Sequence, residues 1–242
     1  MGYEFDWTVL LTYKQLLIDG FVMTLKLSII GIFFAFLIGS FMGLARVSKN
    51  FFVALFATYY VEFFRNIPLI VQMFFIYFSF TLTDSFPFLE PFGDWIGIEN
   101  HNEFFSALIA LITYTSTYIA EAIRGGIQSL PKGQTEAAKT LGMNYTQTMY
   151  FIVFPQAIKI VWGPITGQFL NLIKNSSLAM TIGVAELTFQ TQEIDSLTFR
   201  GFEAATAVTI LYLFLTLFTS YIMALINKYM LIKTASKGGS QR

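Results

Sequence analysis

Charged side chains inside long apolar stretches are the first candidates for chemistry in this chain. Glu62 and Arg65 stand three residues apart, as do Glu121 and Arg124. Residues at this spacing share one face of a helix, so each acid can pair with its arginine. Charged groups within a membrane are costly and mark functional sites by default. For Glu62 and Arg65, which adjoin Asn66, a role in lining a pathway and a structural ion pair both stay open. For Glu121 and Arg124, close to the end of a span, we favour the structural pair.

A second polar group follows the fourth apolar stretch. Lys174, Asn175 and Ser176 stand where a regular helix is expected to give way to irregular backbone. Broken helices inside membranes often carry the substrate sites of transporters, and an ammonium group attracts carboxylates. The alternative is that Lys174 extends along the protein to the outer surface. Both interpretations stay open at this point.

Several kinds of chemistry are excluded by missing motifs. The sequence contains no phosphate-binding G-x-x-x-x-G-K-[ST] loop, no Gly-rich dinucleotide fingerprint and no nucleophile elbow. It has no cysteine, and its single histidine, His101, is predicted to be a solvated residue of an acidic loop. The net charge is zero, which suggests no nucleic-acid partner. We therefore expect neither catalysis, nor a metal, nor a cofactor bound by this chain.

The elements that must position these residues are membrane helices. Of 242 residues, 55% are hydrophobic and only 12% are charged, about half the charged share of a soluble domain. Several apolar runs exceed the roughly 20 residues that span a bilayer. The sequence predicts an all-α membrane protein with five spans, at about 21–44, 51–82, 104–123, 149–172 and 204–230.

Two details qualify this division into spans. Gly39 and Gly43, four residues apart in the first span, would allow close packing against another helix. The segment 175–202 is mixed, and its short apolar part is predicted to be re-entrant or interfacial. A sixth span through residues 178–187 is the alternative, but it would place the basic tail outside.

The distribution of basic residues predicts the orientation. With five spans, one side collects nine basic residues and the other only Lys14 and Arg200. The positive-inside rule makes the first side cytoplasmic, so the N-terminus lies outside and the C-terminus inside. The nine residues are Arg46, Lys49, Arg124, Lys132, Lys139, Lys228, Lys233, Lys237 and Arg242.

The cytoplasmic stretch 131–155 is polar although it lies between long apolar segments. Residues 134–141 are mostly good helix formers, and Gly142 can adopt the left-handed conformation that ends a helix. Such a helix is too short to cross a bilayer. The small side chains of Ala137 and Ala138 would let another protein approach the backbone closely. The stretch therefore suits docking.

The same stretch resembles the EAA loop of ABC-importer permease subunits. The pattern is Glu136-Ala137-Ala138, three residues, Gly142, nine residues, Ile152, one residue and Phe154-Pro155, with Phe154 in place of the usual leucine. The resemblance implies a coupling helix that seats in a cleft of an ATP-hydrolysing subunit. On this basis we assign the coupling role to Glu136, Ala137, Ala138, Leu141 and Gly142.

A second resemblance concerns the substrate. Residues 60–72 read YVEFFRNIPLIVQ and look like a segment of permeases for polar amino acids, and the run NLIKNS at 171–176 is similar to glutamate/aspartate-type permeases. Glutamine-type relatives share much of this pattern. Together with the EAA loop, the resemblance covers most of residues 20–230. It implies a permease that imports polar amino acids, with glutamate/aspartate or glutamine as the expected substrates.

The resemblance also implies a fold and a set of partners. The fold is that of a type I ABC-importer permease, with residues 1–20 periplasmic, 21–231 forming the membrane domain, 131–147 its coupling loop and 232–242 a cytoplasmic tail. The partners are two ATPase subunits that bind ATP and magnesium, a second permease (identical or homologous), and a periplasmic or lipid-anchored amino-acid-binding protein. The location is the bacterial inner membrane, in contact with lipid. The alternative is a secondary transporter or channel driven by an ion gradient, which would predict inverted repeats; we see none.

Overall fold

The computed structural model describes residues 4–238, with side chains described as far as Tyr229, and this part of the chain is helical without strands. In chain order the elements are α1 (Thr8–Thr12), α2 (Lys14–Arg46), α3 (Phe51–Arg65), α4 (Leu69–Ser79), α5 (Leu82–Ser85), α6 (Leu89–Trp95), α7 (His101–Gln128), α8 (Lys132–Thr140), α9 (Tyr145–Thr148), the π-helix η1 (Met149–Val153), α10 (Phe154–Asn175), the 3₁₀-helix η2 (Ser176–Ile182), α11 (Leu187–Thr198) and α12 (Gly201–Gly238).

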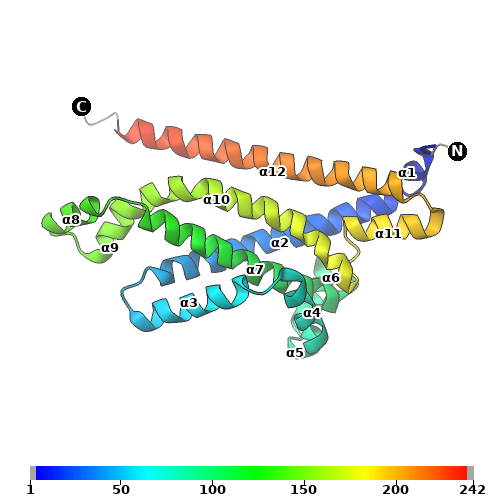
Figure 1. Cartoon of the computed structure of the whole chain (residues 1–242), viewed down its shortest axis with the longest axis horizontal. Helices are drawn as coiled ribbons and strands as arrows, with labels where there is room; N and C mark the ends of the chain where they lie inside the picture. Colours follow the sequence, from blue (N-terminus) through cyan, green and yellow to red (C-terminus); the bar gives the residue numbers. More distant parts are fainter. Residues whose placement is uncertain (1–3, 239–242) are drawn as a thin grey trace.

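Four long segments are able to cross a membrane. Within the described residues, α2, α7, the continuous run Tyr145–Ile182 and α12 are long and apolar enough, and α3 with α4 makes a fifth span if the bent pair is counted as one. The predicted five-span, all-helical fold is confirmed. Figure 1 shows α8 and α9 at one end of the bundle and α1 and α11 at the other.

The bundle is built around α7, which packs against α2, α3, α4 and α10. At the crossing with α2, the backbones nearly touch. A Cβ atom at Gly39 would lie 2.7 Å from the carbonyl oxygen of Ser116, and one at Gly43 would lie 2.8 Å from that of Ala120. The predicted close packing at Gly39 and Gly43 is therefore confirmed, and α7 is its partner.

The second span is broken into two helices. Between α3 and α4 the chain turns by 98°, because Pro68 lacks an N–H group and disfavours helical backbone at Ile67. Gln72, which is 5% exposed, stabilises the bend between α3 and α4. Its Nε2 donates to the carbonyls of Phe64 at 2.7 Å and Ile67 at 2.9 Å. The carbonyl groups that the break leaves unpaired are thereby satisfied.

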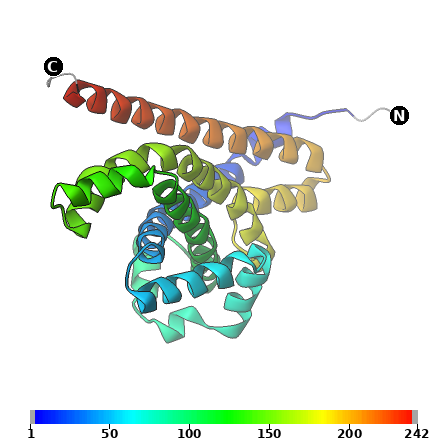
Figure 2. The ribbon, with the colours of Figure 1, turned by 60° about the vertical axis from the view of Figure 1, so that its left-hand side comes forward.

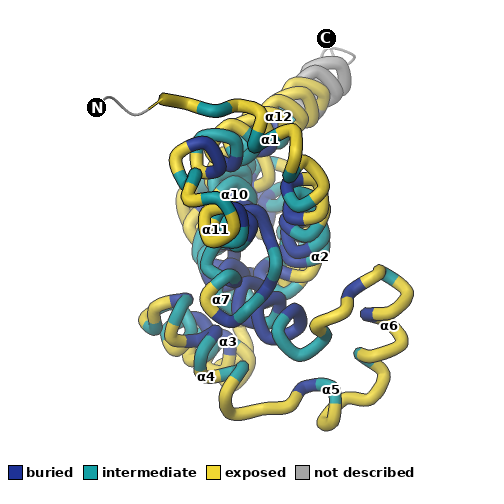
Figure 3. The backbone as a smooth tube through the Cα atoms, turned by 90° about the vertical axis from the view of Figure 1, so that its right-hand side faces the viewer, coloured by how far each residue is buried: buried dark blue, intermediate teal, exposed yellow. Residues whose placement is uncertain are grey.

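The segment after α10 differs from the predicted boundary of the fourth span. The helix does not end near residue 172, because η2 continues it to Ile182. Gly183, with φ of +89°, then turns the chain. The buried carboxylate of Glu186 accepts the N–H groups of Thr188 and Phe189 and so starts α11. Figure 3 shows the chain coloured by burial from this end of the bundle, and α11 lies near its centre.

The last helix is the least covered by the rest of the chain. Figure 2 shows the C-terminal part of α12 extending away from the other helices. Trp162 on α10 ties it back by donating its indole N–H to the carbonyl of Met223 at 3.1 Å. Of the predicted cytoplasmic tail, Arg242 lies outside the described residues.

A substitution that adds one methyl group tests the contact between α2 and α7. We expect Gly39→Ala to lower the free energy of unfolding by about 1–3 kcal/mol, because its Cβ meets backbone atoms that cannot shift cheaply. Gly125→Ala is the matched control, since a Cβ there has no neighbour within 4 Å. Thermal melting of the detergent-solubilised protein measures both. Equal melting temperatures for the two variants would contradict the close crossing.

Candidate functional site

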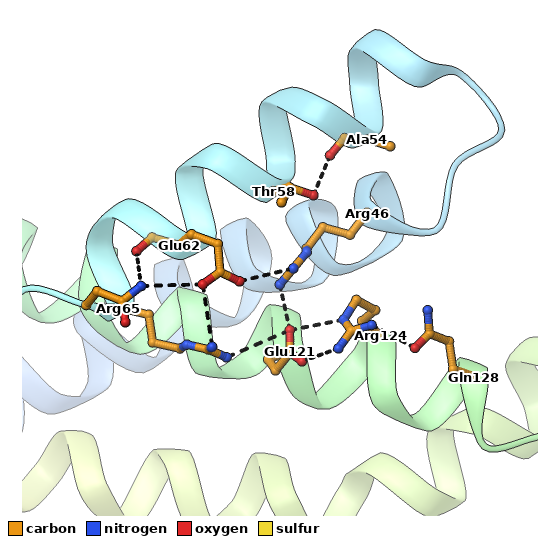
Figure 4. A network of polar contacts seen from close by, with 9 residues as sticks. Arg46, Ala54, Thr58, Glu62, Arg65, Glu121, Arg124 and Gln128 are labelled. Carbon is orange, nitrogen blue, oxygen red and sulfur yellow. Dashed lines mark hydrogen bonds and ion pairs between the residues drawn. The ribbon is translucent and has the colours of Figure 1, made fainter.

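Five charged side chains from three helices form one network in the half of the bundle that carries α8. Arg46 comes from the end of α2, Glu62 and Arg65 from α3, and Glu121 and Arg124 from α7 (Figure 4). Glu121 is its centre. Its Oε2 accepts from Arg46 Nη1 at 2.6 Å and from Arg124 Nε at 3.1 Å, while its Oε1 accepts from Arg124 Nη2.

Glu62 is the second carboxylate of this charge network. Its Oε1 lies 3.3 Å from Arg46 Nη2, and its Oε2 lies 3.6 Å from Arg65 Nη2. Arg65 Nη1 also lies 4.0 Å from Glu121 Oε2. Asn66 donates to the Glu62 backbone carbonyl at 2.6 Å, which holds the end of α3 beside the network. Sequence-predicted pathway residues 62, 65 and 66 are thus brought together.

Three guanidinium groups face two carboxylates, so the charge network carries a formal charge of +1. Arginine stays protonated in proteins. The Arg46 side chain is only 9% exposed, and its Nε has no hydrogen-bond partner among the described residues. Removing one partner from a buried ion pair leaves an uncompensated charge, which is strongly destabilising. The network therefore fixes α2, α3 and α7 relative to one another.

Both predicted pairs, Glu62 with Arg65 and Glu121 with Arg124, are confirmed. The prediction missed that they belong to one cluster, and it placed Arg46 in a basic turn rather than between the two acids. The only feature of the sequence that could have indicated the role of Arg46 is that it is a basic residue at the end of a span. Its partners depend on how α2 crosses α7, which the sequence does not display.

The predicted coupling loop lies directly beyond the network. Arg124 also bonds the amide oxygen of Gln128 at 2.7 Å, at the last residue of α7, and α8 begins four residues later. On α8 and its cap, Ala138 is 1% exposed. The other four predicted coupling residues are exposed; they are Glu136, Ala137, Leu141 and Gly142.

Two caps hold the coupling loop in shape. Gly142 has a φ of +79°, as predicted for the residue that ends the helix, and Met143 N–H donates to the carbonyl of Ala138 at 3.0 Å. Asn144 and Gln147 form a reciprocal capping box at the start of α9. The exposed residues of α8 therefore form a well-defined surface.

The second group of predicted pathway residues, Lys174, Asn175 and Ser176, does not come together into one site. On α10 the Lys174 side chain is exposed, Asn175 is partly buried, and Ser176 is buried and donates to the carbonyl of Ile173 at 2.7 Å. Among the described residues, no hydrogen bond or ion pair joins this group to the charge network. No group of acidic and histidine residues in the described part could hold a metal ion.

His101 differs from its prediction. It begins α7 instead of lying in a solvated loop, and its Nε2 lies 3.1 Å from Asp94 Oδ1. The imidazole packs on Gly93, where a Cβ atom would lie 2.3 Å from its ring. It ties α6 to α7.

Lys174 is the end of a stripe along α10. Lys159, Gly163, Gly167, Asn171 and Lys174 follow one another at helical spacings of four, four, four and three residues. Four of them are exposed and Gly167 is partly buried, and a Cβ atom at either glycine would meet nothing within 4 Å. This polar and small-residue stripe is unlike a surface that faces lipid.

Comparisons with known proteins agree with this geometry. Residues 16–231 match the family model described as binding-protein-dependent transport system inner membrane component. The chain belongs to this family. It is 34% identical to the glutamate/aspartate import permease GltJ of Escherichia coli, over 94% of this chain and 96% of that protein. It is 33% identical to the glutamine transport system permease GlnP of the same organism, over 95% and 99%.

A solved structure shares the fold. The crystal structure of an amino acid ABC transporter with histidines includes a chain that is 32% identical to this one. The TM-score is 0.78, and the match covers 94% of this chain and 100% of that one. The expected membership among ABC-importer permeases related to polar amino acid transport is confirmed, as is the type I fold.

The charge network predicts a specific pattern of stability. Glu121→Gln leaves three guanidinium groups with one carboxylate, so we expect it to lower the free energy of unfolding by about 2 kcal/mol, less than for a fully buried pair because Glu121 is partly exposed. Adding Arg124→Gln restores the charge of +1 and should recover part of the loss.

Denaturant titration of the solubilised protein measures both variants. Lys49→Gln is the control, because Lys49 is an exposed cation at the same end that lies over the ring of Tyr145 instead of in the network. A double variant no more stable than Glu121→Gln would show that the guanidinium groups do not depend on Glu121.

Proposed function

We infer that the chain is the membrane-spanning permease subunit of an ATP-binding-cassette importer for polar amino acids, with glutamate/aspartate or glutamine as substrate. The observation that carries this is the exposed α8, whose C-terminal end is fixed by the Gly142 turn and by the capping box of α9, in a chain that matches permeases over nearly its full length. The partners supply ATP hydrolysis and substrate delivery. No bond in the substrate changes.

The coupling surface receives force from an ATPase subunit. Glu136 and Ala137 on α8, and Leu141 and Gly142 in the turn that follows it, are exposed; they offer a charged group, a small residue, an apolar contact and a close backbone approach. Ala138 is buried and anchors α8 to the permease. Movement of α8 passes into α7 within a few residues, and from there through the charge network into α2 and α3. The network and the coupling loop then act as one mechanical unit.

The pathway lies along the uncovered stripe of α10. Two ammonium groups, at Lys159 and Lys174, and the backbone exposed at the two glycines would be poorly accommodated by lipid. A second permease, identical or homologous, covers the stripe and leaves a polar path between the subunits. Two such subunits require two ATPase subunits, one for each α8.

The orientation follows from charge. The end of the bundle with α8 carries the basic residues of the first two predicted cytoplasmic segments, so it faces the cytoplasm, and the N-terminus lies outside. An amino-acid-binding protein, periplasmic or lipid-anchored, then delivers substrate at the end with α6 and α11. ATP-driven closure of the ATPase subunits opens the path outward, and hydrolysis resets it.

Reconstitution tests the function directly. The chain is purified with the products of its neighbouring genes, placed in proteoliposomes, and supplied with binding protein and ATP. Accumulation of labelled glutamate or glutamine only with ATP is expected. Transport that continues without ATP or any ATPase subunit would refute the proposal and favour an ion-driven carrier.

The coupling surface yields the first functional prediction. We expect Glu136→Lys and Gly142→Asp to reduce ATP-dependent uptake at least about tenfold, because a reversed charge or a new side chain blocks the docking surface. Membrane insertion should stay unchanged in both variants, and the melting temperature should stay unchanged for Glu136→Lys, since Glu136 is exposed. Gly142→Asp should lower the melting temperature slightly, because Gly142 has a φ of +79°. Glu136→Gln is the graded control and should lose less. Normal uptake in both severe variants would refute the coupling role.

Lys174 is the subject of the second functional prediction. Lys174→Ala should lower uptake of labelled substrate severalfold by removing a cation that contacts the substrate carboxylate, whereas Lys174→Arg should keep most of it. The control is Lys14→Ala, an exposed lysine at the start of α2. Uptake kinetics in proteoliposomes distinguish the variants. Equal uptake kinetics for Lys174→Ala and the parent protein would show that Lys174 does not contact the substrate.

A further inference from the structure

A cavity of about 460 Å³ lies at the end of the bundle opposite α8, and no residue of the charge network or of the α10 stripe lines it. Three separate parts of the chain line it: the N-terminal half of α2, the connection between α6 and α7 with the start of α7, and the connection between η2 and α11 with the start of α11. Its volume falls in the range of small-molecule sites, roughly 300–1,000 Å³. None of the predicted site residues lines it.

The rim of this outer cavity is charged. Asp19 and Glu99 contribute exposed carboxylates, and Lys26 contributes a partly buried ammonium group. The Lys26 Nζ donates to the carbonyl of Gly97 at 2.9 Å and so joins α2 to the loop. The three charges sum to a formal −1. The rim therefore suits a ligand with a positive group and at most one negative group.

Gln190 supplies an unused acceptor in the wall. It is 4% exposed, and its Nε2 donates to the carbonyl of Ala185 at 3.3 Å. Its Oε1 is buried and has no hydrogen-bond partner among the described residues. A buried acceptor without a donor is costly, unless a ligand supplies one. Gln190 lies against α2, where a Cβ atom at Gly20 would be 2.6 Å from its Cγ.

The remaining wall is apolar. Leu16 and Met23 on α2 and the buried Phe104 on α7 line it together with Val184. An aliphatic chain of a few carbon atoms can rest on this surface, while its polar ends meet the rim and Gln190. The cavity thus combines one apolar wall, an acidic rim with a single cation, and a vacant acceptor.

We propose that the outer cavity binds a zwitterionic amino acid whose side chain donates hydrogen bonds, glutamine being the type, before it enters the pathway. The ammonium group pairs with Asp19 and Glu99, the carboxylate pairs with Lys26, and the side-chain amide donates to Gln190. Glutamate has a second carboxylate in place of the donor, so the rim and Gln190 both disfavour it. This inference rests on the proposed function and narrows its substrate.

A lysine of the docking binding protein is the competing occupant. It would pair with Asp19 and Glu99 but would leave both Lys26 and the Gln190 acceptor without a new partner. A free amino acid satisfies all three kinds of group at once. The chemistry of the lining therefore favours the amino acid.

Binding without the binding protein tests this site. The complex of the permease with its ATPase subunits is placed in nanodiscs, and equilibrium dialysis measures binding of labelled L-glutamine and its displacement by L-glutamate. We expect saturable glutamine binding and at least about tenfold weaker displacement by glutamate. Absence of glutamine binding, or equal displacement by glutamate, would overturn the proposal.

Variants locate the binding in the outer cavity. The double variant Asp19→Asn/Glu99→Gln should bind glutamine about tenfold more weakly, and Gln190→Met should narrow the preference for glutamine over glutamate. Glu90→Gln is the matched control, because Glu90 is an exposed acid of α6 that does not line the cavity. Melting temperature and basal ATPase rate check that each variant is folded. Unchanged glutamine binding in the double variant would overturn the proposal.

The same samples separate this inference from the proposed function. If the double variant loses docking of the binding protein yet binds glutamine normally, the cavity receives a side chain of that protein and the proposal is wrong. If ATP-dependent uptake is normal while the nanodisc complex binds no glutamine, only the outer site fails. If no polar amino acid is taken up by the complete system, the proposed function fails first.

Discussion

The backbone contact between α2 and α7 is the constraint on which the other features depend. Gly39 and Gly43 allow the two helices to approach until a single methyl group would collide with a carbonyl oxygen. Arg46 stands three residues beyond Gly43, and only this close crossing brings its side chain to Glu121. The glycines are therefore part of the charged site, although they carry no functional group.

α7 joins the different parts of the molecule into one working unit. Its N-terminal end lines the cavity at Phe104, its middle packs against α2, and its C-terminal end carries Glu121 and Arg124 before the chain turns into α8. Such a long, largely buried helix moves as a rigid body more readily than it bends. Under the proposed function, a displacement of α8 therefore passes to the charge network and, through α7, to the opposite end of the bundle.

Much of this arrangement could be predicted from the sequence because it depends on local pattern. The lengths of the apolar runs predicted the spans, the residues of 134–142 predicted a short helix that ends at Gly142, and the three-residue spacings predicted two ion pairs. The place of Arg46 in the network and the walls of the outer cavity could not be predicted, since both unite segments far apart in the chain. The continuation of the fourth span by η2 was missed because Lys174 and its polar neighbours read as a helix end, yet Ser176 bonds back to Ile173 within the helix.

The formal charge of +1 on the network has an electrical consequence. Carrying one elementary charge across the whole membrane costs or releases about 2.3 kcal/mol per 100 mV. A conformational change that moves the network through a tenth of that field therefore changes the energy by only about 0.2 kcal/mol. Without Glu62 and Glu121 the moving charge would be three times as large. The two carboxylates thus leave the network with one third of the charge on which a membrane voltage would otherwise act.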